Sequence, residues 1–279
     1  MQGAGNDFLL VETRDESRDW GPLSQAMCER HYGAGADGLI LVLPSQSAGL
    51  RMRLFNADGS EAEVSGNGVR CLVKYAVERG LARPADGRLT VEAASGLLVA
   101  EITGDEQHVE RVRLSMGAPR FEPVEVPVDT DMAPPVIDMP LDVDGERLAV
   151  SCLSMGNPHA VAFIERPVEE YPLERLGPKV EHHPAFPARV NFGVAFVESE
   201  ARMHLRVWER GVGETLACGS GSCAAMVAAR LKGLAGDRVD ITQPGGELTV
   251  EWAPDERGRG EVFLSGGAEF VYDGDWPDA

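Results

Sequence analysis

The chain contains one sequence pattern twice, as Asn56-Ala-Asp-Gly-Ser-Glu-Ala-Glu-Val-Ser-Gly-Asn-Gly68 and as Glu209-Arg-Gly-Val-Gly-Glu-Thr-Leu-Ala-Cys-Gly-Ser-Gly221. The two copies are separated by a constant offset of 153 residues. At this offset, an acidic residue and two glycines of the first copy coincide with the same residue types in the second. At that offset Ser65 corresponds to Cys218. The repeat predicts two related halves. Their two groups suit a reaction that needs a base on one side of a carbon and an acid on the other.

Composition favours a globular chain of one large or two ordinary domains, with 279 residues, 43% apolar and 25% charged. No apolar run approaches the roughly 20 residues that a membrane helix needs. The N-terminus lacks the basic stretch and apolar core of a signal peptide. We therefore expect a cytoplasmic protein without a membrane partner. The net charge of −19, without a local basic patch, argues against nucleic acid as a partner.

The cysteines predict neither disulfides nor a metal site. Five cysteines, an odd number and widely spread, do not form a disulfide framework in a chain without a secretion signal. Cys218 and Cys223 have no second pair of ligands nearby, and the histidines show no ligand spacing, so no zinc site is expected. We expect Cys71, Cys152 and Cys223 to be small buried apolar side chains.

Hydrophobic periodicity predicts a similar series of elements in both halves. In the first half it predicts helices over 24–30 and 68–78, and strands over 8–12, 39–43, 51–56, 89–93, 97–103 and 109–114. In the second half it predicts a helix over 221–232 and strands over 159–164, 191–197 and 204–208, with further strands after the helix. The Pro- and Asp-rich stretch 122–144 is interpreted as a surface connection at the start of the second domain.

These elements indicate an α/β fold of the α+β type, with two pseudo-symmetric domains and an active site in the cleft between them. We expect an N-terminal domain of residues 1–117 plus 264–279 and a C-terminal domain of residues 118–263.

Ser65 and Cys218 each stand immediately before a glycine-rich turn and a predicted helix. Unpaired backbone N–H groups and the positive end of the helix dipole gather at such a position. It can hold a carboxylate and can lower a thiol pKa from about 8.5 into the range ~3.5–7.5. Serine is a common helix N-cap, so Ser65 alone is explained as a structural cap. Cysteine is not, which makes Cys218 the sharper functional signal.

Together with the repeat, further motifs make the chain resemble the diaminopimelate epimerase family of cofactor-independent racemases. In chain order the motifs are Gly3-Ala-Gly-Asn-Asp-Phe8, Gly35-Ala-Asp-Gly38, Asn56 to Glu61, Ser65-Gly-Asn-Gly-Val-Arg-Cys71, Met155-Gly-Asn-Pro-His159, Arg189-Val-Asn-Phe192, Glu209 to Gly219 and Val271-Tyr-Asp-Gly274. The resemblance implies a curved, mostly antiparallel sheet around a central helix in each domain. It also implies a homodimer whose contact includes Tyr272.

The resemblance implies a two-base epimerisation of LL-diaminopimelate to the meso form, without pyridoxal phosphate, metal or other cofactor. One cysteine thiolate removes the Cα proton, and a second thiol on the other face returns one. Cys218 is one of this pair, Ser65 stands at the place of the other, and Glu209 and His159 orient and tune the site. The implied substrate-binding groups are the side chains of Asn6, Asn56, Asn157, Asn191 and Arg210, and the backbone of Gly66, Asn67, Gly219 and Ser220.

Serine departs from the family, which has cysteine at position 65, and Cys71 lies too far along the helix to replace it. A hydroxyl that ionises near 15.7 is about 7 pKa units weaker than a thiol, or ~9–10 kcal/mol, whereas a helix N-terminus supplies at most ~2 kcal/mol. Ser65 therefore marks an engineered replacement, a natural variant with altered chemistry, or a binding protein without turnover. The alternative functions are a non-catalytic amino-acid sensor, a one-base racemase or dehydratase using Cys218, and a thiol hydrolase pairing Cys218 with His159.

Overall fold

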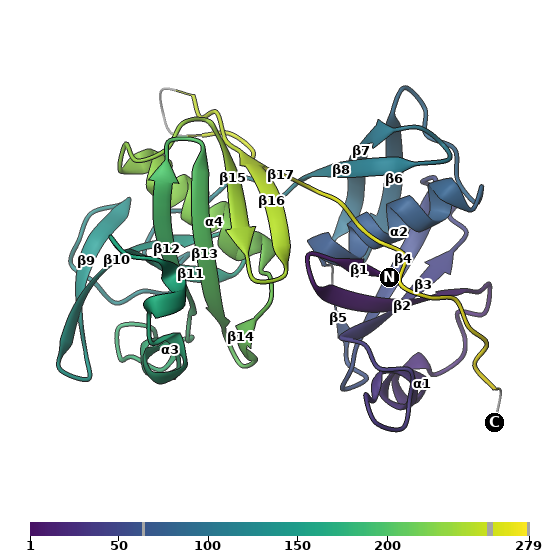
Figure 1. Cartoon of the computed structure of the whole chain (residues 1–279), viewed down its shortest axis with the longest axis horizontal. Coiled ribbons are helices and arrows are strands. Elements are labelled where there is room, and N and C mark those ends of the chain that lie inside the picture. Colours follow the sequence, from purple (N-terminus) through teal and green to yellow (C-terminus); the bar gives the residue numbers. More distant parts are fainter. Residues whose placement is uncertain (63–64, 256–258, 278–279) are drawn as a thin grey trace. The chain divides into compact units, whose positions relative to one another are not determined.

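The computed structural model describes residues 1–62, 65–255 and 259–277. The chain forms two compact units. The first comprises Met1–Leu114 with Gly266–Ala279, and the second comprises Ser115–Ser265. Both have the α+β architecture expected from the sequence: a mostly antiparallel sheet with one long helix against it (Figure 1). Among the described residues, no helix is both long enough and apolar enough to cross a membrane.

The sheet of the first unit holds one long helix on one face and a shorter helix on the other. Helix α2 (Gly66–Glu78) contacts β1 to β4, and α1 (Trp20–Cys28) contacts β3 and β4. All side chains of β3 are buried, because alternate residues pack beneath α2 and α1. The strands are β1 (Gln2–Gly3), β2 (Asn6–Glu12), β3 (Gly38–Leu43), β4 (Leu50–Asn56), β5 (Glu61–Ala62), β6 (Arg88–Ala93), β7 (Gly96–Gly104) and β8 (Val109–Ser115).

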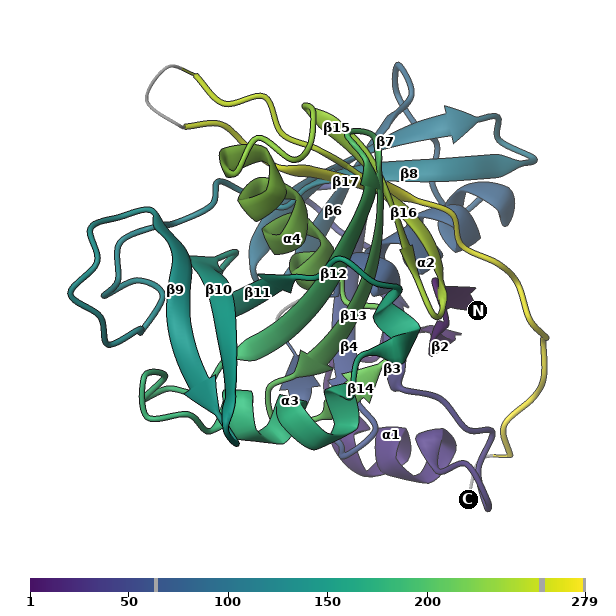
Figure 2. The same ribbon diagram turned by 60° about the vertical axis from the view of Figure 1, so that its left-hand side comes forward.

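The second unit repeats this plan. Helix α4 (Gly219–Leu231) contacts β10 to β13 and β16, and Figure 2 shows it beside β11 and β12. Helix α3 (Leu173–Glu181), which follows the 3-10 turn η1 (Val168–Glu170), contacts β9 and β12 to β14. The strands are β9 (Val136–Val143), β10 (Glu146–Ser154), β11 (Pro158–Phe163), β12 (Asn191–Ser199), β13 (Arg202–Glu209), β14 (Gly213–Thr215), β15 (Arg238–Gln243), β16 (Gly246–Glu251) and β17 (Phe263–Gly266).

The offset of 153 residues holds in the structure as well as in the sequence. It relates both ends of α2 to both ends of α4. It also relates two pairings at the ends of β4 and β13: Leu54 opposite Ala62, and Val207 opposite Thr215. Each unit also has two parallel strand pairs at equivalent places. In the first unit these pairs are β2–β3 and β4–β6, and in the second unit they are β11–β12 and β13–β15. The predicted relation between the halves is therefore confirmed at the level of strand register.

Two sequence predictions differ from the structure. Helix α1 begins at Trp20, four residues before the predicted start, because Asp19 caps it by accepting a hydrogen bond from Gly21 N. The stretch 122–144 is not only a surface connection, since β9 forms its last part. The sequence contained the signals for this strand, namely the alternating apolar residues Met139, Leu141 and Val143 and an Asp-Gly turn at 144–145 leading into β10. No strand was predicted for β10, and no helix for α3.

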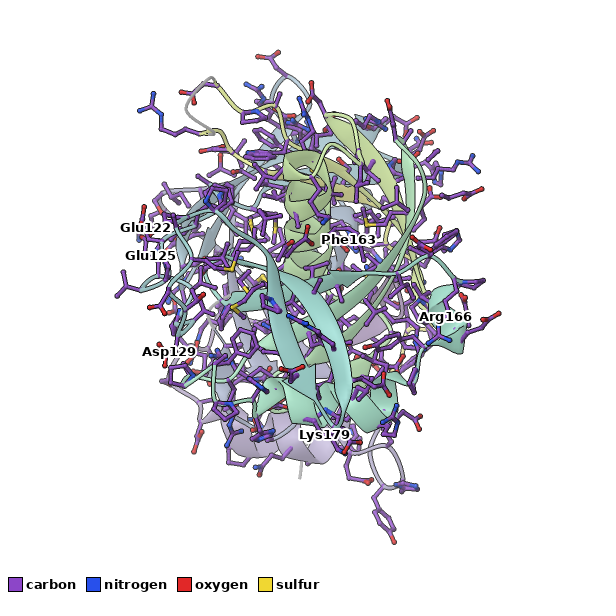
Figure 3. The ribbon with its side chains drawn as sticks, turned by 90° about the vertical axis from the view of Figure 1, so that its left-hand side faces the viewer. Glu122, Glu125, Asp129, Phe163, Arg166 and Lys179 are labelled. Carbon is purple, nitrogen blue, oxygen red and sulfur yellow. The ribbon has the colours of Figure 1, made fainter. Side chains whose placement is uncertain are left out.

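The first part of that stretch does run over the surface. Glu122, Glu125 and Asp129 are exposed, and Figure 3 shows them along one outer edge of the second unit. Val126 and Val128 are buried between them and join the core beside α3. These two valines hold an otherwise charged segment against the unit.

Candidate active site

Both long helices begin in the same way, at the residues that the sequence singled out. Ser65 is the N-cap of α2 with φ −130° and ψ 123°, and Cys218 is the N-cap of α4 with φ −126° and ψ 110°. Ser65 Oγ accepts a hydrogen bond from Gly68 N at 3.2 Å, and Cys218 Sγ accepts one from Gly221 N at 3.4 Å. The sulfur atom thus occupies the position that a serine hydroxyl occupies in a normal cap.

The third residue of each helix is a glycine, and at both positions a side chain would meet tight contacts. A Cβ atom at Gly68 would lie 3.1 Å from Ile40 Cδ1 and 3.3 Å from Ser65 Cβ. A Cβ atom at Gly221 would lie 3.0 Å from Val207 Cγ2 and 3.2 Å from the Sγ atom of the N-cap cysteine. These glycines therefore fix the position of the cap residue.

In the second unit, four predicted site residues form a chain of hydrogen bonds that ends at the thiol. His159 Nε2 lies 3.0 Å from Asn157 Oδ1, and Asn157 Nδ2 donates to Ser220 Oγ at 3.2 Å. Ser220 Oγ lies 3.6 Å from Cys218 Sγ. Because Ser220 accepts from the amide, its own hydrogen is free to point at sulfur. Because the Asn157 amide turns its oxygen toward His159, the imidazole must donate this hydrogen bond, which assigns its proton to Nε2.

His159 is a neutral member of this chain. The ring is buried, and burial first, with the nearby Arg210 second, lowers the pKa of His159 to about 3. A neutral imidazole with hydrogen on Nε2 is a donor to Asn157 and not a cation at neutral pH. His159 therefore orients the chain and contributes no charge to it.

The thiol of Cys218 is more basic than the sequence predicted. Burial raises its pKa, the carboxylate of Glu209 raises it further, and the hydrogen bonds from Ser220 and Gly221 only partly oppose them. The helix N-terminus, which can lower a thiol pKa, is outweighed here by burial, because a buried charge loses its hydration. The carboxylate of Glu209 lies close enough to the thiol to raise its pKa, and it accepts a hydrogen bond from Thr215 Oγ1 at 2.6 Å. A proton acceptor thus stands next to the sulfur.

The turn between β13 and β14 contains the predicted site residue Arg210 and is held by two buried side chains. Asn191 Oδ1 accepts from Arg210 N at 2.9 Å, and Glu181 Oε1 accepts from Gly211 N at 2.9 Å. Glu181 Oε2 also accepts from the indole of Trp208 at 2.8 Å. Asn191 in addition donates to Pro158 O, so both ends of its amide contact backbone.

In the first unit the predicted residues form a smaller cluster. Asn67 Nδ2 donates to Asn6 Oδ1 at 3.2 Å, and Asn6 Nδ2 donates to Asp37 at 2.6 Å. The Oδ1 atom of Asn67 is buried and has no hydrogen-bond partner among the described residues. Asn56 lies apart from this cluster and donates to Ser60 Oγ.

Three residues with a clear place in the site were missed by sequence reasoning. Glu181 supports the β13–β14 turn, Asp37 orients Asn6, and Gln243 Oε1 accepts from Cys218 N at 2.9 Å. Asp37 lies within a motif that was quoted, so a sequence signal existed. Glu181 and Gln243 lie 30 and 25 residues from their partners and belong to no motif. Only the folded chain brings them to the site.

The arrangement suits proton transfer next to a bound carboxylate. The first N–H groups of a helix have no acceptor within it, so Gly66 and Asn67, and likewise Gly219 and Ser220, present free donors beside the cap residue. The described residues include no group of three or more His, Cys, Asp and Glu side chains that could hold a metal ion.

Comparison with known proteins identifies relatives along nearly the whole chain. A sequence profile of the family described as "Diaminopimelate epimerase" matches residues 1–122 and 151–271. A protein of Desulforudis audaxviator named diaminopimelate epimerase is 46% identical over 278 residues, covering 99% of this chain and 97% of that protein. One of Pelotomaculum thermopropionicum with the same name is 44% identical over 280 residues, covering 99% and 96%.

Solved structures at lower identity share the fold. A phenazine biosynthesis protein of the PhzF family from Bacillus anthracis has a TM-score of 0.71 at 19% identity, covering 98% of this chain and 93% of that one. A hydroxyproline epimerase from Agrobacterium vitis, with bound trans-4-hydroxy-L-proline, has a TM-score of 0.68 at 16% identity, covering 98% and 89%.

Proposed function

Because the chain belongs to the diaminopimelate epimerase family, we propose that it acts on diaminopimelate and transfers a proton at one Cα, the reaction that links the LL and meso forms. The observation that supports this most directly is Cys218. Its thiol caps a helix whose free N–H groups suit a substrate carboxylate, next to the acceptor Glu209. No cofactor enters the proposal.

We assign the acid–base roles from the contacts of the thiol. Glu209 takes the proton of Cys218 when the substrate binds, because its carboxylate is a proton acceptor close to the sulfur. The thiolate, which accepts hydrogen bonds from Gly221 N and Ser220 Oγ, then removes the Cα proton. His159 and Asn157 keep the Ser220 hydroxyl directed at sulfur.

We assign the binding roles to the backbone at the two helix starts and to the polar side chains of the predicted site. In the second unit the backbone of Gly219 and Ser220 binds the reacting carboxylate, and in the first unit the backbone of Gly66 and Asn67 offers the corresponding donors. Asn6 and Asn56 and the guanidinium of Arg210 bind the polar groups of the substrate. Asn191 acts by holding the backbone of Arg210, since its amide already has two backbone partners.

Ser65 limits what the chain can do. Its hydroxyl is a helix cap and a weak acid, so it cannot return or remove a Cα proton as a thiol does. We expect Cys218 to exchange the Cα hydrogen on its own face of one stereoisomer, while inversion is slow. Ser65→Cys is expected to restore inversion.

The test is deuterium uptake at Cα from deuterated water, with LL- and meso-diaminopimelate as separate substrates. We expect exchange with retention in the chain with Ser65, exchange with inversion in Ser65→Cys, and neither in Cys218→Ala. If the chain with Ser65 shows no uptake at any pH while Ser65→Cys exchanges freely, turnover by this chain is rejected. Calorimetric binding of diaminopimelate that persists in Cys218→Ala would then favour the second candidate, an amino-acid sensor, which Ser65 also suggests.

A homodimer and a cytoplasmic location also belong to this proposal. They are expected of a biosynthetic enzyme of this family, and Tyr272 is the residue expected at the dimer contact. Sedimentation of the natural protein and of Tyr272→Ala tests the dimer, and cell fractionation tests the location. A monomer at micromolar concentration would contradict the first.

A further inference from the structure

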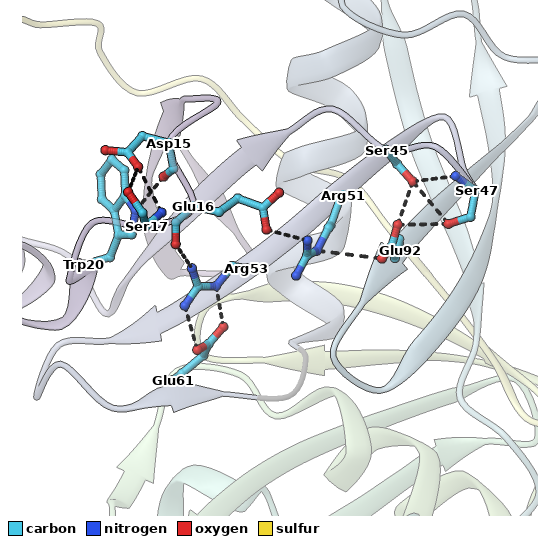
Figure 4. Close-up of polar contacts among 10 residues, drawn as sticks. All are labelled: Asp15, Glu16, Ser17, Trp20, Ser45, Ser47, Arg51, Arg53, Glu61 and Glu92. Atoms are coloured by element: carbon cyan, nitrogen blue, oxygen red, sulfur yellow. Dashed lines mark hydrogen bonds and ion pairs between the residues drawn. The ribbon is translucent and has the colours of Figure 1, made fainter.

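In each unit, an arginine and a glutamate at equivalent positions form a bidentate ion pair, with two parallel hydrogen bonds. In the first unit, Arg53 Nε and Nη2 donate to the two carboxylate oxygens of Glu61 at 2.7 and 2.9 Å (Figure 4). In the second unit, Arg206 Nε and Nη2 donate to the two oxygens of Glu214 at 2.7 and 2.8 Å. The offset of 153 residues relates both members of one pair to those of the other.

Each pair closes the short hairpin that precedes a helix cap. The arginine lies on β4 or β13 and the glutamate on β5 or β14, so that each pair crosses between two antiparallel strands. Strand β14 ends at Thr215, three residues before Cys218. Strand β5 ends at Ala62, three residues before Ser65. Holding β14 therefore restrains residues 216–217, which connect this strand to Cys218.

The pair in the second unit has further contacts that fix it. The Nη1 atom of Arg206 donates to Val168 O at 2.8 Å and to Tyr171 O at 3.0 Å, and the side chain is only 15% exposed. Next to Glu214, Thr215 donates to Glu209, the carboxylate beside the thiol. The strand that Arg206 holds thus supports both the sulfur and its proton acceptor.

The pair in the first unit is more exposed. Arg53 is 20% exposed and Glu61 is 42% exposed, and Arg53 Nη1 reaches Glu16 O at 3.5 Å. The guanidinium also lies over the ring of Phe55 at 4.9 Å from its centre. Because water screens exposed charges, we expect this pair to hold its hairpin less firmly than its counterpart does.

We propose that Arg206–Glu214 and Arg53–Glu61 are two positioning pairs, each of which sets the cap residue of its own helix: Cys218 in one unit and Ser65 in the other. This inference rests on the proposed role of Cys218 as the base. Neither pair is required to touch the substrate. Arg206–Glu214 acts through residues 215–217, which lie between Glu214 and Cys218.

The test uses thiol reactivity, which reports the position of each cap residue without any turnover. Alkylation by iodoacetamide is followed site by site by mass spectrometry in the Ser65→Cys background. We expect Glu214→Gln to raise the alkylation rate of Cys218 about tenfold, as a loss of about 1.4 kcal/mol in closing the hairpin would produce. The rate of the thiol introduced at position 65 should stay within about twofold of its value in that background.

The matched control is Glu61→Gln in the same background, with the opposite expectation. The thiol introduced at position 65 should react faster, and Cys218 should be unchanged within about twofold. Arg206→Lys, which keeps the charge but loses the two parallel hydrogen bonds, should fall between the parent and Glu214→Gln at Cys218. Unchanged thermal unfolding in any one of these variants shows that its effect is local.

Two results overturn the inference. The first is that Cys218 is alkylated at the parent rate in both Glu214→Gln and Arg206→Lys. The other is an equal increase at both thiols in either glutamine variant, which would indicate general loosening. Because alkylation needs no substrate, a failure of the proposed epimerase activity would leave this pattern intact and is seen separately in the deuterium assay.

Discussion

Glu181→Gln tests how far the turn after β13 depends on one buried carboxylate. In the structure, the two oxygens of Glu181 accept from Trp208 Nε1 at 2.8 Å and from Gly211 N at 2.9 Å. The side chain is 4% exposed, and Arg189 lies 3.8 Å away. Glutamine has the same shape but only one oxygen, so one of the two donors must face an amide NH₂ group.

The magnitude follows from the hydrogen bond that is lost. A hydrogen bond to a charged group contributes about 1.5–3 kcal/mol to the free energy of unfolding. A buried donor left without an acceptor adds a penalty of similar size in the worst case. We expect Glu181→Gln to reduce the free energy of unfolding by about 2–3 kcal/mol. Because Gly211 follows Arg210, we also expect a lower rate of Cα proton exchange at saturating substrate.

The assay is urea unfolding in a double-mutant cycle with Trp208→Phe, which removes the indole donor. If Glu181 binds Trp208 as described, the two changes are not additive, and the coupling is about 1 kcal/mol. Additive effects within about 0.3 kcal/mol would refute the contact. An unchanged exchange rate in a destabilised Glu181→Gln would refute the link from this carboxylate to the turn.

Three further predictions concern the thiol and its neighbours. Gly221→Ala places a methyl group 3.0 Å from Val207 Cγ2 and 3.2 Å from Cys218 Sγ, so proton exchange should fall at least about tenfold. Thermal unfolding should occur at a lower temperature, because overpacking costs about 1–3 kcal/mol and helix propensity returns at most about 1 kcal/mol; normal exchange would contradict the packing. Ser220→Ala removes the hydroxyl that faces sulfur, and the midpoint of the pH profile of Cys218 alkylation should move upward; a downward shift would refute that role. Since burial lowers the pKa of His159 to about 3, from about 6.5 when unfolded, the unfolded chain binds more protons between these values, and stability should fall as pH drops from about 6.5 to about 3. His159→Gln should remove that part of the urea-midpoint profile, and an unaltered profile would show that other groups cause it.

Much of the site could be inferred from single residues and their spacing. The cap positions of Ser65 and Cys218 follow from the Gly-rich turn and the periodic apolar residues after each. The burial of Cys71, Cys152 and Cys223, as expected for small apolar side chains, is confirmed. The pKa of Cys218 could not be inferred, because it depends on how much water the folded unit excludes and on where Glu209 lies.

The sequence by itself determined that the chain has two related halves, where each long helix begins, and which family it belongs to, because a repeat, glycine spacing and apolar periodicity are local properties of the chain. Only the tertiary structure decided that His159 is neutral, that Glu181 and Gln243 support the site, and that Arg206 pairs with Glu214 as Arg53 does with Glu61. The physical reason is that desolvation and hydrogen bonding depend on distances between atoms, and folding sets those distances for residues that the sequence keeps apart.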